Sequence, residues 1–577
     1  MDLTAWFQPN DHEVENLSWQ RRAWPWWCFL AVLLVSVIPL VWSGLPQRDV
    51  AFRYIPMAEA FRDGDFAYAF HPRPGFLHTF IAGIIAWLFG CDGFLACKLS
   101  STLFMALAAF PLYGVMKLTY SRMAAEACTV TFVLASQLHR LTTSGLRDSH
   151  KTFLILLGAY ALVLIYQQRE NWKAYLLLGA TAGLGVVTRG DMVLFMVLLF
   201  FWGQVLELKL KGFPWRSLAG GLLAAVLTMP STLLNWRFAG TAMPDIHFDR
   251  FFEQWFHRHP ALPDTLLLMT AGLAACLVMA WVVRRVMDLG FGKWLFGVVL
   301  AGLAAVIYWK ASSPSFYLGV SLPVYFRAVV MGFFPVFAVW ALVGAVWRIR
   351  RGEWTGSDSF LAVLLLGHAL QICFQILVCD GKLYVTPRYL MPAMPLEIGW
   401  AVYGVIATWE LLSSPFRDKY PRLVRNFAIL VLVLAAGGFL LDIYRPVFEA
   451  LSKKKHREEL MLKHVADIIR SDYKGKGTVA PAIDRDMYRD MYVPRRSPGV
   501  CFLFYSKYLK KVIPDGGRIT LSVYLAGGRI ELTQENADYL VERIPDWKDR
   551  KTAPGLVLLA TVQGKKEELY RIWRIEK

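Results

Sequence analysis

Thirteen apolar segments, each roughly long enough to cross a bilayer, dominate the first 445 of the 577 residues. An α-helix needs about 20 consecutive apolar residues to span the hydrocarbon core. The segments lie at about 25–43, 94–116, 123–139, 151–166, 174–188, 191–207, 217–235, 264–283, 294–310, 326–347, 359–379, 392–410 and 426–442. Segments of this length satisfy their backbone hydrogen bonds in lipid as helices. The sequence therefore predicts an all-α polytopic membrane protein with about 13 transmembrane helices.

The strong positive charge of the chain is explained by membrane orientation. The 62 Lys and Arg residues exceed the 44 Asp and Glu residues, which gives a net charge of +18. Such an excess is also typical of nucleic-acid-binding proteins. Polytopic membrane proteins, however, collect Lys and Arg in their cytoplasmic loops. Because the basic clusters lie in short loops between apolar segments, no nucleic-acid partner is expected.

The basic loops also decide whether the short apolar segment 76–89 crosses the membrane. It has about 14 residues, which is short for a span. If it lies in the outer interface, Arg21, Arg22 and the later basic loops all share the cytoplasmic side, as the positive-inside rule requires. Residues 1–24 are then cytoplasmic, residues 25–445 form the transmembrane domain, and the C-terminus lies outside. The Asn16 sequon falls on the cytoplasmic side, which favours a bacterial inner membrane.

Residues 446–577 differ in composition from the membrane domain and predict a small α/β domain on the periplasmic face. A mixed helix is expected from Lys453 to about Arg470, and a second helix near 534–544. Strand-like runs lie at 500–505, 519–525, 555–562 and 570–575. No glycine-rich phosphate motif is present in this region, so nucleotide binding is not indicated.

Charged residues collect in the loops that this topology places outside. They include Asp49 and Arg73 near the two ends of the first outer loop, Asp148 in the second outer loop, and Lys382 and Arg388 before the segment at 392–410. The spans themselves hold few ionisable groups, whereas ion and proton carriers place such groups inside the membrane. The sequence therefore favours chemistry at the outer boundary, where the phosphate of a lipid lies.

A second polar feature lies within one span. His368, Gln371 and Gln375 share one helical face, and we interpret them as a stripe of hydrogen bonds between helices.

The order of these residues resembles the GT-C superfamily of membrane glycosyltransferases. The resemblance rests on Asp49-x4-Tyr54-x3-Ala58-Glu59 with Asp63-Gly64-Asp65, on Asp148 after the third span, and on Gly381-Lys382-Leu383 followed by Tyr389 and Pro392. It covers roughly residues 25–410, and the nearest families are the lipid A aminoarabinose transferases and the bacterial protein O-mannosyltransferase-like enzymes. The resemblance implies a polyprenyl-phosphate sugar donor, an active site on the outer face and inversion at the anomeric carbon.

One departure concerns a metal ion and the acceptor. The aminoarabinose transferases carry Glu-Lys-Pro where this chain has Pro72-Arg73-Pro74, so the carboxylate that helps hold a metal is missing. His71 and His247 are the remaining candidate ligands for a divalent metal ion, and metal dependence stays open. The departure also leaves open whether the acceptor is a lipid, a glycan or a protein.

The transfer chemistry assigns a role to each candidate residue. An alcohol needs a base when it attacks, and Asp49 is expected to be that base, supported by Asp148. The departing lipid phosphate gains charge, which Arg73, Lys382 and Arg388 would stabilise. Tyr389 would add one hydrogen bond to the phosphate.

Simpler roles remain for the same residues. Asp49 can cap a helix, and Asp148 can form an ordinary ion pair with Arg147. Arg73 and Arg388 can extend to the headgroups without binding substrate. The nearby Arg189 and Asp191 are interpreted as a structural pair. The alternative functions are a lipid or sugar-lipid transporter without transferase activity, and a noncatalytic assembly protein whose outer domain binds partners.

Overall fold

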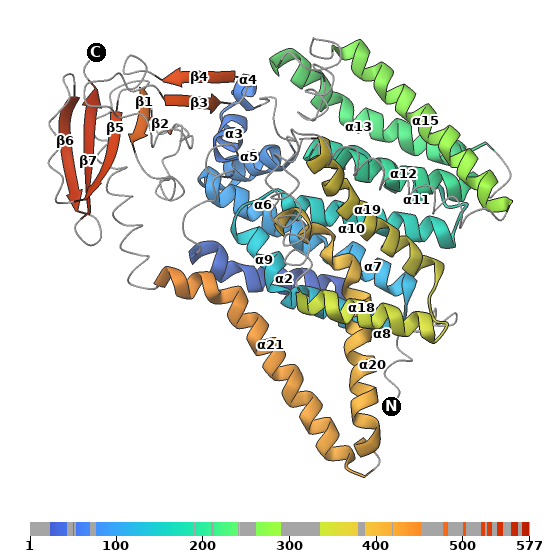
Figure 1. The fold of residues 1–577 in the computed structure, drawn as a ribbon. Helices are drawn as coiled ribbons and strands as arrows, with labels where there is room; N and C mark the ends of the chain where they lie inside the picture. Colours follow the sequence, from blue (N-terminus) through green and yellow to red (C-terminus); the bar gives the residue numbers. More distant parts are fainter. Residues whose placement is uncertain are drawn as a thin grey trace.

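A computed structural model shows a helical membrane domain followed by strands (Figure 1). The structure describes residues 23–42, 50, 54–69, 77–189, 192–208, 213–239, 242, 261–289, 335–378, 387–417 and 419–451, and the strands between 477 and 575. The predicted span at 294–310 lies outside the described residues. Each of the other predicted spans coincides at least in part with a helix.

The helices follow the predicted order along the chain. They are α2 (Trp24–Trp42), α3 (Ile55–Arg62), α4 (Phe66–Ala69), α5 (Leu77–Phe89), α6 (Gly93–Leu107), α7 (Ala109–Thr119), α8 (Arg122–Leu134), α9 (Ser136–Thr143), α10 (Asp148–Gln167), α11 (Trp172–Thr188), α12 (Val193–Glu207), α13 (Trp215–Ala239), α15 (Leu262–Asp288), α18 (Pro335–Arg350), α19 (Gly356–Val378), α20 (Ile398–Arg417) and α21 (Pro421–Leu451). The prediction of an all-α polytopic membrane domain is confirmed, and the chain is an integral membrane protein.

The number of spans stays a prediction. Within the described ranges, five helical stretches are long and apolar enough to cross a membrane, and further apolar helices are shorter. The segment at 76–89 is confirmed as a helix, α5, but its position in the outer interface is not tested. It packs closely on α3, because a Cβ at Gly83 would lie 2.9 Å from the carbonyl oxygen of Ala58.

One predicted span begins differently from the expectation. Residues Met391–Glu397, at the start of the segment at 392–410, form a 3-10 helix, η6, and α20 begins only at Ile398. Pro392 and Pro395 explain the difference, because proline lacks the N–H that an α-helix requires in its interior. This irregular entry leads directly from the short 3-10 turn η5 (Pro387–Tyr389), which carries two predicted site residues.

The helices pack by direct contact between their backbones at glycines. A Cβ at Gly344 of α18 would lie 1.9 Å from the carbonyl oxygen of Trp400 in α20, and one at Gly404 would lie 2.1 Å from that of Trp340. Small residues that let helix backbones approach closely are typical of membrane interfaces. The α18–α20 pair therefore has no space for a larger side chain at either glycine.

We expect Gly344→Ala to destabilise the protein by about 1–3 kcal/mol, because the added methyl group must force α18 and α20 apart. Gly272 of α15 is the matched control, since a Cβ there would meet nothing within 4 Å. Gly272→Ala should be neutral or slightly stabilising, since alanine is the better helix former. Thermal unfolding in detergent measures both variants, and equal midpoints would contradict the packing argument.

The C-terminal residues form strands in two sheets. The strands are β1 (Gly477–Ala482), β2 (Val500–Phe502), β3 (Leu521–Leu525), β4 (Gly528–Leu532), β5 (Tyr539–Pro545), β6 (Leu556–Gln563) and β7 (Glu568–Ile575). One sheet has the order β2-β1-β5-β7-β6, with β1 parallel to β2 and to β5, and β7 antiparallel to β5 and β6. The other is the antiparallel hairpin β3-β4.

The predicted strands near 500, 521, 556 and 570 are all found in this region. The predicted helix near 534–544 is wrong over Tyr539–Pro545, which pairs along its whole length with β7 as strand β5. Over so short a run, the apolar and polar residues of Tyr539–Pro545 fit a strand as well as a helix. The predicted helix from Lys453 to about Arg470 lies outside the described residues, so the α/β domain over 446–577 stays a prediction.

Candidate functional site

A buried ion pair joins the start of α10 to the end of α11. Asp148 is the first residue of α10 and is 1% exposed. One oxygen of its carboxylate accepts a hydrogen bond of 2.6 Å from the guanidinium of Arg189, the residue that follows α11 and is 6% exposed. An acidic group is favoured at a helix N-terminus, where the helix dipole is positive. The pair therefore anchors a cation at the junction of two helices.

A third segment completes this arrangement. The guanidinium carbon of Arg189 lies 4.8 Å from the ring centre of Tyr389, and that of Arg388 lies 5.5 Å from the same ring. The imidazole of His368 in α19 donates a 2.9 Å hydrogen bond to the carbonyl oxygen of Tyr389, because a carbonyl can only accept. Two arginines therefore lie near one tyrosine ring, and a hydrogen bond from α19 to the backbone of Tyr389 holds that residue in place.

The residue before Asp148 points to another part of the chain. The guanidinium carbon of Arg147 lies 5.6 Å from the ring centre of Tyr54, which immediately precedes α3. The imidazole of His78 in α5 donates a 3.1 Å hydrogen bond to the carbonyl oxygen of Gly145. Gly145 has a φ of +68°, a backbone conformation that favours glycine. These contacts attach the segment between α9 and α10 to the start of α3 and to α5.

Buried histidines extend the same contacts into the helices. Since Nε2 of His78 donates to Gly145, its Nδ1 is an acceptor, and the hydroxyl of Ser100 lies 3.5 Å from it. The Ser100 oxygen lies 3.2 Å from Nε2 of His150, whose ring stacks on Phe104 with centres 3.7 Å apart. Ser100 and both histidines are fully buried. These contacts join α5 and α6 to the first turn of α10, which begins at Asp148.

The structure brings some of the predicted site residues together. Asp148, Arg388 and Tyr389 lie around Arg189, although they are far apart in sequence. The other candidates lie outside the described residues; they are Asp49, Arg73, Lys382, His71 and His247. Their roles stay predictions.

Sequence reasoning missed Arg189 as part of the site. It was interpreted only as a structural pair with Asp191, which lies outside the described residues, so that pair stays a prediction. The structure shows that Arg189 also pairs with Asp148, 41 positions earlier. In the described part of the chain, Asp148 forms no ion pair with its neighbour Arg147. The polar stripe on α19 is confirmed in part, since His368 does bond across to another segment.

The metal prediction is not resolved by the described part of the chain. Within it, no three His, Cys, Asp or Glu side chains converge as ligands would. Both candidate ligands, His71 and His247, fall outside that part.

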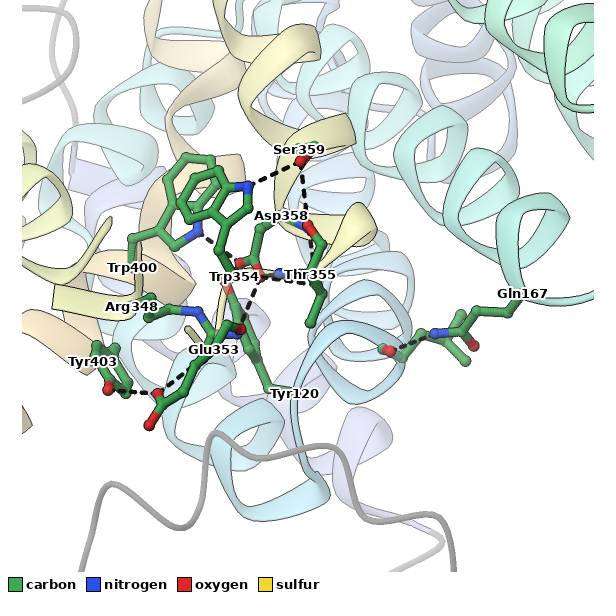
Figure 2. A network of polar contacts seen from close by, with 11 residues as sticks. Tyr120, Gln167, Arg348, Glu353, Trp354, Thr355, Asp358, Ser359, Trp400 and Tyr403 are labelled. Carbon is green, nitrogen blue, oxygen red and sulfur yellow. Dashed lines mark hydrogen bonds and ion pairs between the residues drawn. The ribbon is translucent and has the colours of Figure 1, made fainter. Parts of the chain in front are cut away.

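A second buried ion pair lies at the N-terminal end of α19 (Figure 2). Arg348 and Asp358 are both 0% exposed, and the guanidinium donates a 3.0 Å hydrogen bond to the carboxylate. The same carboxylate accepts hydrogen bonds from the hydroxyl of Tyr120 at 3.0 Å, from the indole of Trp400 at 2.9 Å and from the hydroxyl of Thr355 at 2.8 Å. Every oxygen of Asp358 is thus satisfied by groups from four helices or loops.

The remaining members of this network close its edge. The hydroxyl of Tyr403 donates a 2.6 Å hydrogen bond to the carboxylate of Glu353, which lies 3.9 Å from Arg348. The indole rings of Trp354 and Trp400 stack with centres 5.5 Å apart (Figure 2). A network that satisfies its own charges in this way has little capacity left for a substrate. We therefore assign it a structural role, and the candidate site is the cluster around Asp148 and Arg189.

Comparison with known proteins gives one family match and several structural matches. Residues 71–235 match the dolichyl-phosphate-mannose-protein mannosyltransferase family. This segment contains α5 to α12 and most of α13, and with them Arg147, Asp148 and Arg189. No curated protein sequence matches the chain significantly.

Two solved membrane enzymes are similar over most of the chain. ArnT from Cupriavidus metallidurans, crystallised with undecaprenyl phosphate, has a TM-score of 0.52 at 12% identity, over 96% of this chain and 98% of its own. The Archaeoglobus fulgidus oligosaccharyltransferase tethered with an acceptor peptide has a TM-score of 0.51 at 13% identity, over 91% of this chain and 70% of its own. The chain therefore has the fold of the GT-C glycosyltransferases, with a mannosyltransferase-family segment that carries the Asp148–Arg189 pair.

Proposed function

We propose that the protein is a membrane glycosyltransferase that moves a sugar from a polyprenyl-phosphate donor to an acceptor hydroxyl on the outer, periplasmic face. The observation that carries the proposal is the convergence of Asp148, Arg189, Arg388 and Tyr389 from three distant segments. Two arginines at one boundary of a membrane domain match the charge and shape of a lipid phosphate. The mannosyltransferase-family segment and a structural relative bound to undecaprenyl phosphate support the same donor class.

Asp148 has a positioning role in this proposal. Its carboxylate is engaged by Arg189 at 2.6 Å and is almost fully buried, so it is poorly placed to accept a proton from an acceptor. It instead holds the guanidinium of Arg189 beside the ring of Tyr389. Preorganised donors of this kind stabilise charge without reorganising during the reaction.

The reaction forms one bond and breaks one bond at the anomeric carbon. The acceptor oxygen attacks that carbon while the bond from the carbon to the bridging phosphate oxygen breaks, and the polyprenyl phosphate leaves with the electron pair. Arg388 and Arg189 stabilise the charge that develops on the phosphate. The acceptor proton passes to a carboxylate, for which Asp49 is proposed. Attack opposite the leaving group inverts the anomeric configuration.

We expect Asp49→Asn to lower kcat by about 100- to 10,000-fold, because an amide cannot accept the acceptor proton. The measurement is sugar transfer from a purified polyprenyl-phosphate sugar by the full chain in detergent, with a membrane extract as the source of acceptor. Asp65→Asn is the matched control, since Asp65 also lies between the first predicted span and α5, is exposed, and contributes the hydrogen bonds given for it through its backbone, which the substitution keeps.

The possible outcomes test the role of Asp49 as the base separately from the proposed transferase activity. Wild-type turnover in a folded Asp49→Asn protein would overturn the role of Asp49 and leave the enzyme class intact. Absence of transfer by the wild type, together with donor movement across proteoliposomes, would instead favour a transporter of sugar-lipids.

A further inference from the structure

The first turn of α10 contains polar groups that the Asp148–Arg189 pair does not use. The Nε and Nη1 atoms of Arg147 are buried, and neither has a hydrogen-bond partner among the described residues. The fully buried Ser149 hydroxyl two positions later is in the same condition within that part of the chain. In sequence these groups flank Asp148, and among the described residues neither of them hydrogen-bonds to a carboxylate.

Arg147 differs in this respect from other arginines of the membrane domain. Arg122 pairs with Glu126, Arg140 with Asp442 and Arg348 with Asp358, at 2.9 Å, 2.6 Å and 3.0 Å. For Arg147 the structure shows no ion pair within the described ranges, only the ring of Tyr54 at 5.6 Å from the guanidinium carbon. Arg147 as a whole is half-buried, but its buried Nε and Nη1 atoms are costly to leave without hydrogen-bond acceptors, and an anion would supply them.

The local backbone adds to the attraction for an anion. Arg147 is the N-terminal cap residue of the 20-residue helix α10 and makes no side-chain cap hydrogen bond. The first amides of a helix have no carbonyl partner one turn earlier, and the helix dipole makes this end positive. An oxyanion at this end of α10 would come within reach of the Arg147 guanidinium and of backbone amides, a combination suited to phosphate, and the Ser149 hydroxyl lies in the same turn.

We propose that Arg147 and Ser149 bind the phosphate of the lipid donor at the first turn of α10, as donor-binding residues in addition to Arg388. This inference rests on the proposed function and deepens it. The phosphate would then lie between Tyr54 of the first outer loop and the Asp148–Arg189 pair. Arg147 supplies two N–H donors to the phosphate oxygens, and the Ser149 hydroxyl supplies a third donor.

The test is binding of an unloaded polyprenyl phosphate to the full chain in detergent, measured by quenching of the protein's tryptophan fluorescence. The probes are undecaprenyl phosphate, the uncharged undecaprenol and inorganic phosphate. The variants are Arg147→Met and Ser149→Ala. Arg140→Met is the matched control, because Arg140 lies in the same region but is paired with Asp442. Thermal unfolding in the same detergent confirms that each variant is folded.

We expect wild type to bind undecaprenyl phosphate and not undecaprenol. Arg147→Met should weaken that binding about 10- to 100-fold and Ser149→Ala about 3- to 10-fold, from the loss of charge-assisted and neutral hydrogen bonds. Arg140→Met should bind like wild type. Competition by millimolar inorganic phosphate would show that the site recognises the phosphate rather than the lipid chain.

Two results would overturn the inference. Equal affinity of Arg147→Met, Ser149→Ala and wild type for undecaprenyl phosphate would remove these residues from the site, while the proposed function stands. Equal binding of undecaprenol and undecaprenyl phosphate by wild type would overturn the phosphate site and the proposed donor class together. If Arg147→Met fails to fold, Ser149→Ala and the charge-conserving Arg147→Lys decide the question by the same measurement.

Discussion

Arg189→Met is expected to lower sugar transfer by about 100- to 1,000-fold, the range typical for loss of a preorganised donor to a developing negative charge. The substitution also leaves Asp148 as a buried carboxylate without its cation, which should cost about 3–5 kcal/mol of stability. The two effects need separate measurements. Transfer from a polyprenyl-phosphate sugar reports the first, and thermal unfolding in detergent reports the second.

A double substitution separates the chemical role of Arg189 from its structural one. Asp148→Leu combined with Arg189→Met removes both charges, so stability should return toward that of wild type. Transfer should stay low, because the cation beside Tyr389 is still absent. Arg189→Lys should keep the protein stable and recover part of the activity, with the loss mainly in kcat. Full activity in the double variant would show that the pair only supports the fold.

A control ion pair is available in another helix of the membrane domain, α8. Arg122 and Glu126 form an ion pair of 2.9 Å within α8, and Glu126 is partly exposed. Partly exposed pairs of this kind contribute about 0–1 kcal/mol. Arg122→Met should therefore change neither transfer nor the unfolding midpoint by much.

Asp358→Ala should be the most destabilising single substitution in the described part of the chain. It leaves Arg348, which is 0% exposed, without its carboxylate, and it removes the acceptor of Tyr120, Trp400 and Thr355. Breaking a buried pair costs about 3–5 kcal/mol, and unsatisfied buried donors add about 1–3 kcal/mol each. We expect little folded protein in the membrane, measured by size-exclusion profile and thermal unfolding.

Glu353→Gln is the matched control for this network. Glu353 lies 3.9 Å from Arg348 and is partly exposed, and glutamine can still accept from Tyr403. Its effect should be about 1 kcal/mol or less. Molecules of Asp358→Ala that do fold should retain transfer, because Asp358 lies ten residues, or about 15 Å, before His368 along α19. A stable Asp358→Ala protein without transfer would move the active site to this network.

The sequence predicts the helices well because a span must be both long and apolar. The exceptions have local causes. The break between α6 and α7 at Ala108 comes just before Pro111, which cannot donate to the carbonyl four residues earlier, and η6 replaces the start of a span at Pro392 and Pro395. Strand β5 was assigned as a helix because its pairing with β7 is a tertiary contact that a local pattern does not contain.

The site was predicted only in part, for a related reason. Asp148, Arg388 and Tyr389 are visible as polar residues at span ends, but which partner each one chooses depends on helix packing. Arg189 binds Asp148, which lies 41 positions earlier in another helix, and no local pattern contains that contact. Arg147 has an apparent partner at the adjacent position, yet it forms no ion pair with Asp148 in the described part of the chain, and its guanidinium lies beside Tyr54. A charged neighbour in sequence therefore does not by itself identify the partner of an arginine in a bundle.

The stacking of Arg189 on Tyr389 also sets when the protein becomes active during its synthesis. The two residues are 200 positions apart, so at roughly 5–20 residues per second the ribosome makes the ring roughly 10–40 s after the guanidinium. Until then an inserted nascent chain lacks one part of the candidate site around Arg189. Under the proposed function, translation thereby delays binding of the lipid donor until nearly the whole membrane domain is in place, and a chain that ends before residue 387 should insert but not turn over.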